Sequence, residues 1–109
     1  MQGPDNADLQ DALQYRDNTE AAFDQLAASV GMNIQKHAAA VIRGEKIVGI
    51  PHEALEDIAQ LLNGKGHLED AEAQLSRIRG YPEAAEFHEA QRDNYWSMRE
   101  KIRARIRGS

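Results

Sequence analysis

Apolar residues recur with helical spacing in the longest patterned stretch of the chain, from Asp17 to Arg43. Successive members of the pattern are three or four residues apart: Phe23, Ala27, Val30, Ile34, His37 and Val41. At about 100° per residue this spacing places them on one stripe of a helix. The stripe extends back toward Leu9 with interruptions at Arg16 and Glu20. We therefore predict one long helix over residues 5–43, with irregularities expected near Asp17 and at Gly31.

Glycine and proline divide the middle of the chain. Residues 44–51 contain Gly44, Gly49 and Pro51 around the short apolar run Lys46-Ile47-Val48, and this pattern predicts a loop pinned by apolar side chains. Pro51 suits the start of a helix over 52–63, which Asn63-Gly64 would end. A further short helix is predicted over 67–79. The expected buried faces of these two helices are Leu55, Ile58, Ala59 and Leu62, then Leu68, Ala71, Leu75 and Ile78.

Pro82 opens the last predicted helix, over 82–107. Tyr95, Met98 and Ile102 continue an apolar stripe along it, and its end is basic. The predicted fold is therefore all-α, with two long helices bracketing a short helical hairpin in a bundle-like arrangement. Residues 5–107 form one domain, residues 1–4 are expected to be disordered, and residues 108–109 are expected to be disordered or to derive from the expression vector.

Composition favours assembly with other chains. The chain has 109 residues, of which 6% are aromatic, so its own core is thin and a homo-oligomer is expected to complete it. There is no cysteine, no run of 18 apolar residues and no signal-peptide pattern, which favours a cytoplasmic protein without a membrane span. Residues 1–30 carry six acidic residues against Arg16, whereas residues 99–107 carry five basic residues against Glu100. Head-to-tail or antiparallel pairing of helices would join these opposite charges.

Histidine and glutamate residues raise the question of a metal site. A ferritin-like bundle needs Glu-x-x-His on two helices, and this spacing does not occur in the sequence. His52 and His67 fall at predicted helix starts, where solvation is expected. His37 and His88 fall on apolar stripes, which favours buried neutral histidines or a pH-sensitive assembly over phosphotransfer. We predict no cofactor and no metal, and no catalytic residue.

The basic end of the last helix is the best candidate for partner binding. The only tryptophan, Trp96, lies on a helical face with Arg92, Arg99 and Arg103, outside the apolar stripe. Arginine and tryptophan are common in interface hot spots, so a protein partner could bind there. Nucleic acid could use the same residues, with arginines on phosphates and the indole on a base. In the purely structural alternative, they form a cation–π cluster that packs on the first helix.

The sequence therefore favours a non-enzymatic helical protein–protein interaction or assembly module of the adaptor, chaperone, regulator or inhibitor type. It would act as a homo-oligomer, with another protein favoured over nucleic acid as partner. Its predicted oligomer or core stripe comprises Phe23, Ala27, Val30, Ile34, His37, Val41, Tyr95, Met98 and Ile102. The alternatives are a nucleic-acid-binding regulator using the Arg/Trp face, and a ferritin-like metal-binding bundle.

Overall fold

The computed structural model describes residues 6–45 and 49–108. Three of our predictions lie outside these residues: the loop at Lys46-Ile47-Val48, the disorder of residues 1–4, and the disorder of residue 109. Residue 108 is described, as the C-cap of the last helix.

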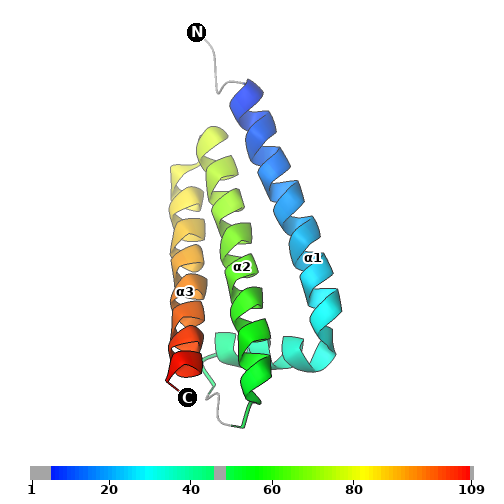
Figure 1. The fold of residues 1–109 in the computed structure, drawn as a ribbon. Coiled ribbons are helices and arrows are strands. Elements are labelled where there is room, and N and C mark those ends of the chain that lie inside the picture. The colour runs from blue at the N-terminus through cyan, green and yellow to red at the C-terminus, as the bar shows by residue number, and fades with distance from the viewer. Residues whose placement is uncertain (1–5, 46–48, 109) are drawn as a thin grey trace.

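Three helices make up the described part of the chain (Figure 1). They are α1 (Asn6–Ile42), α2 (His52–Ile78) and α3 (Pro82–Arg107). The all-helical class is confirmed, and the predicted long helices agree closely with α1 and α3. The prediction of four helices is wrong, because the two short helices expected over 52–63 and 67–79 are one continuous helix, α2.

Helix α2 passes through Gly64, which we expected to end a helix, and through Gly66. Gly64 and Gly66 have no positive φ angle, so neither forms a left-handed helix stop. Their missing side chains instead let aromatic rings approach the helix: a Cβ at Gly64 would meet the Phe23 ring, and a Cβ at Gly66 would meet the Trp96 indole. The glycines thus serve close packing of two neighbouring helices rather than a turn.

The buried residues of α2 lie on two sides of the helix. At 100° per residue, Ala59, Leu62, Gly66 and Ala73 share the side toward α3, whereas Ala71 and Leu75 point about 150° away, toward α1. Figure 1 shows the reason, since α2 lies between α1 and α3 and is covered from both sides. Because both sides are buried, α2 lacks the single apolar stripe that would mark it as one continuous helix when only the sequence is read.

The expected irregularity at Gly31 is present. Gly31 has φ 85° and ψ 171°, which lie outside the helical region, so α1 is two helical segments joined at a sharp bend. The segment after Gly31 crosses the end of the bundle toward α3 (Figure 1). No comparable non-helical residue occurs at Asp17.

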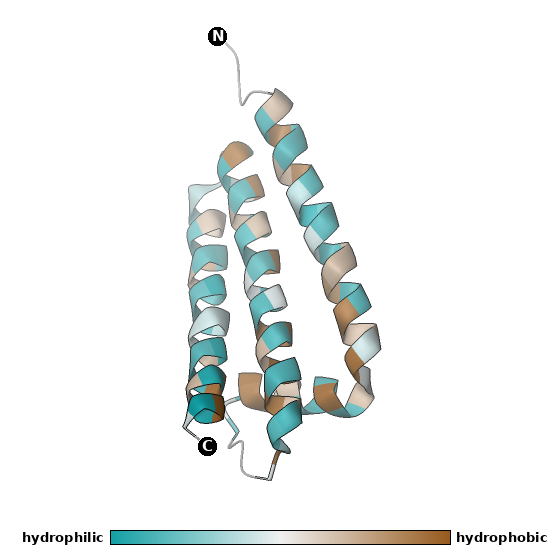
Figure 2. Cartoon of the chain, in the orientation of Figure 1, coloured by the Kyte–Doolittle hydropathy of each residue, from teal (hydrophilic) through white to brown (hydrophobic). Residues whose placement is uncertain are grey.

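The core lies at the end of the bundle where this second segment crosses. Ala38 from α1 packs there with Ile58 and Leu62 from α2 and with Ile102 from α3, each at most 3% exposed. Figure 2 shows that hydrophobic residues gather at this end, whereas the helices toward the opposite end carry mostly hydrophilic residues. The segment of α1 after Gly31 therefore covers one end of the three-helix bundle.

Candidate interaction site at the α1 elbow

Exposed and partly exposed apolar residues flank the bend at Gly31, which we call the elbow. Met32 is 68% exposed, the largest exposure among the large hydrophobic residues of the described chain. Leu26, Val30 and Ile34 lie within five residues of Gly31 and are only partly buried against the core. We call Leu26, Val30, Met32 and Ile34 the elbow surface.

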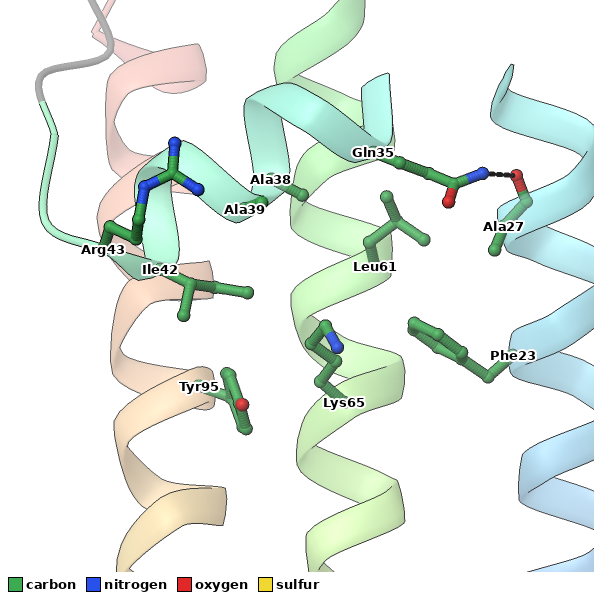
Figure 3. A pocket seen from close by; sticks show the side chains of 10 residues that line it. All are labelled: Phe23, Ala27, Gln35, Ala38, Ala39, Ile42, Arg43, Leu61, Lys65 and Tyr95. Carbon is green, nitrogen blue, oxygen red and sulfur yellow. Dashed lines mark hydrogen bonds between the residues drawn. The ribbon is translucent and has the colours of Figure 1, made fainter. Parts of the chain in front are cut away.

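The elbow is braced by a hydrogen bond that spans it. The Gln35 side-chain amide donates to the backbone carbonyl of Ala27 at 2.8 Å, joining the two segments of α1 (Figure 3). The non-helical backbone at Gly31 interrupts the regular hydrogen-bond series there, so this side chain supplies a replacement contact across the bend.

A pocket of about 400 Å³ lies between the two segments of α1, α2 and Tyr95 of α3 (Figure 3). We call it the crossover pocket. Its lining is mainly apolar and aromatic, and it comprises Phe23, Ala27, Gln35, Ala38, Ala39, Ile42, Arg43, Leu61, Lys65 and Tyr95. Its volume and composition are within the range of small-molecule sites.

Lys65 supplies a positive charge to the crossover pocket. Its ammonium lies 5.2 Å from the centre of the Phe23 ring and 5.9 Å from that of Tyr95, close enough for cation–π attraction to both. No carboxylate of the described residues forms an ion pair with it. The other cation of the pocket, Arg43, is held by Glu45 at 2.7 Å. Burial, and then Glu69, raise the pKa of the Tyr95 hydroxyl, which stays protonated.

Three of the residues predicted to bind a partner contact α2: Arg92, Trp96 and Arg99. Trp96 Nε1 donates to the carbonyl of Asn63 at 3.3 Å, and Arg99 donates to the Asn63 side-chain oxygen at 2.6 Å. Arg92 and Arg99 each lie 5.4 Å from the indole. Arg103 is more exposed, at 38%, and lies 3.7 Å from Glu100. The cation–π cluster is therefore present, but it packs on α2, and the expectation that it packs on the first helix is wrong.

A polar network links α1 to α3 through Asp70 of α2. The Tyr15 hydroxyl donates to Asp70 at 2.9 Å, and Arg92 donates to the other Asp70 oxygen at 2.8 Å. Burial, and then the hydrogen bond to Asp70, raise the pKa of Tyr15 to about 12. Arg92 would have to break its hydrogen bond to Asp70 before it could bind a phosphate. Nucleic-acid binding through this face stays a prediction, and the lost hydrogen bond would weaken it.

The histidines take part in different local contacts. His67 Nδ1 lies 3.2 Å from the Tyr15 hydroxyl and packs edge-on against Trp96. His88 Nδ1 hydrogen-bonds Glu69 at 3.0 Å, His37 is half-buried, and His52 is exposed. Within residues 6–45 and 49–108, no three His, Cys, Asp or Glu side chains are grouped so that they could hold a metal ion.

The predicted oligomer or core stripe lies mainly on the core side of the bundle. Ile102 is buried, and most of the other stripe residues pack against the core while remaining partly exposed: Phe23, Ala27, Val30, Ile34, Val41, Tyr95 and Met98. Sequence reasoning missed Lys65 and Gln35. Neither residue is part of a motif, and only the bend of α1 places them beside a pocket.

The fold and the site define an all-helical protein with one bent helix. No protein-family model, no curated protein and no solved structure matches the chain. Over the residues that the structure describes, no helix combines the length and the apolar character needed to cross a membrane.

Proposed function

We propose that the chain is a non-enzymatic, cytoplasmic protein–protein interaction module that acts as a homo-oligomer and docks through the elbow surface. The observation that carries the proposal is the exposure of Met32 at a bend whose neighbours Leu26, Val30 and Ile34 are also only partly buried. Covering these side chains would remove apolar area from water, which favours association. Methionine is flexible and polarisable, so it adapts well to a partner surface.

The Arg/Trp face is a weaker docking surface than the elbow. Arg92, Trp96 and Arg99 already make hydrogen bonds to α2, so a partner would have to compete with these contacts. Met32 makes no such contact, so the only cost of burying it is the conformational entropy that its side chain loses.

The test is the solution mass by light scattering over a wide range of protein concentrations, for the natural chain and two variants. Met32→Glu places a charge in the elbow surface and is expected to shift the mass toward the monomer. Asn33→Glu adds the same charge at the adjacent exposed residue and is expected to leave the mass nearly unchanged. A natural chain that stays monomeric would refute homo-oligomerisation. An oligomer that Met32→Glu leaves intact would refute the elbow surface.

A further inference from the structure

The crossover pocket holds a positive charge that no carboxylate of the described residues pairs with. Ion pairs between helices occupy Arg77 and Arg92, whereas Lys65 has only aromatic rings as partners among the described residues. A lysine ammonium in mainly apolar surroundings attracts an anion strongly, because the surrounding low-polarity groups screen the attraction weakly.

From this arrangement we infer that the crossover pocket is a binding site for a small apolar monocarboxylate, with its carboxylate on Lys65 and its hydrocarbon body among Ala38, Ala39 and Leu61. The site goes beyond the proposed docking function, because it lies on the inner side of the elbow and needs no second chain.

The charge of the pocket selects the class of ligand. The single free ammonium matches one negative charge, and it would repel a cation. A phosphate group carries more charge and more oxygen atoms than one ammonium can satisfy, and the second cation, Arg43, is held by Glu45. A carboxylate has one charge and two oxygens, so it fits the one donor group that the pocket offers.

The remaining surfaces of the pocket select the body of the ligand. Ala27, Ala38, Ala39, Ile42 and Leu61 present no polar side-chain atoms, and the Gln35 amide already donates to Ala27. A polar body placed along these apolar side chains would lose hydrogen bonds with water and gain none from them. A hydrocarbon body would instead replace water along apolar side chains, which favours binding.

Octanoate is a suitable probe, with 1-octanol as the neutral molecule of equal chain length. Titration calorimetry would give the two affinities, and backbone amide shifts in NMR spectra would locate the binding. We expect octanoate to bind at least tenfold more tightly than 1-octanol, with the shifts gathered around Leu61, Lys65 and Ala38. Equal affinities would overturn the carboxylate class, and no binding, or shifts only elsewhere, would overturn the site.

Variants separate charge recognition from the shape of the pocket. Lys65→Met is expected to weaken octanoate at least tenfold and 1-octanol less than twofold, whereas Lys65→Arg keeps most of the octanoate affinity. Lys36→Met removes an exposed lysine of the same elbow and is expected to change neither affinity. Ala39→Leu, which fills the pocket, is expected to weaken both ligands. An equal loss with Lys36→Met, or full octanoate binding by a folded Lys65→Met protein, would overturn the inference.

Discussion

Gly66 and Gly64 provide a sharp test of how α2 packs, because the same substitution is expected to have opposite effects at the two positions. The three atoms nearest to a Cβ at Gly66 all belong to the Trp96 indole, and the closest lies well inside contact distance. The indole is itself fixed by the hydrogen bond to Asn63 and by the edge-on contact with His67. Gly66→Ala therefore forces Trp96 to move.

The expected loss for Gly66→Ala follows from three contributions to the free energy of unfolding. Alanine stabilises a helix interior by about 1 kcal/mol relative to glycine. Overpacking costs roughly 2 kcal/mol, and the loss of the Trp96 hydrogen bond costs about 1 kcal/mol. The net effect is a destabilisation of about 2 kcal/mol, which corresponds to a fall in Tm of roughly 10 °C for a domain of this size.

Gly64→Ala is the matched control. A Cβ there would lie 2.7 Å from Cδ1 of Phe23, but this ring borders the crossover pocket and has room to turn away. The helix propensity of alanine then dominates, so the free energy of unfolding is expected to stay equal or to rise by up to about 1 kcal/mol. A left-handed glycine that ended a helix at this position would give the opposite result, a loss of about 1 kcal/mol.

Thermal and urea unfolding, followed by circular dichroism at 222 nm, would measure both variants. Placing Gly66→Ala in a Trp96→Phe background should reduce its cost, because the smaller ring leaves space for the methyl group. Our reasoning would be refuted if Gly66→Ala stabilised the protein as much as Gly64→Ala, since Trp96 could not then lie against Gly66.

Two further predictions concern the elbow and the Asp70 network. Gly31→Ala places a side chain at φ 85°, where only glycine is unstrained, and is expected to cost about 1–3 kcal/mol in urea unfolding; a cost near zero would contradict the bend. The folded-state pKa of Tyr15 is raised from 10.0 to about 12, so its contribution to stability is complete below pH 10 and is lost as the pH rises toward 12. Tyr15→Phe should flatten the pH dependence of Tm between these values, and an unchanged slope would argue against both the burial of this hydroxyl and its hydrogen bond to Asp70.

The helical spacing predicted α1 and α3 well because each has one apolar stripe facing one side. Pro82 begins α3, as expected from the first-turn preference of proline. An irregularity at Gly31 was also expected, but the sharp bend that it makes was not, and the irregularity expected near Asp17 is absent. The features predicted correctly depend on neighbours along the chain, which the sequence displays directly.

The course of α2 and the contents of the crossover pocket could not be predicted in the same way. Asn63-Gly64 has the form of a helix stop, and only the approach of Phe23 and Trp96 reveals why the glycines are present. Likewise, Lys65 resembles an ordinary solvated lysine until the packing of α1 on α2 brings Phe23 to it and the packing of α3 brings Tyr95. Both features depend on contacts between residues far apart in the sequence.

The central position of α2 means that α3 and the first segment of α1 are held to the rest of the molecule in different ways. Helices α2 and α3 form an antiparallel hairpin joined by a short turn at Gly80 and Tyr81, whereas the part of α1 before Gly31 rests on α2 along one side only. Local opening requires the least free energy where the fewest buried contacts are broken. We therefore expect the segment of α1 before Gly31 to open from α2 at a lower free energy than the α2–α3 hairpin needs to unfold, with the elbow as the hinge.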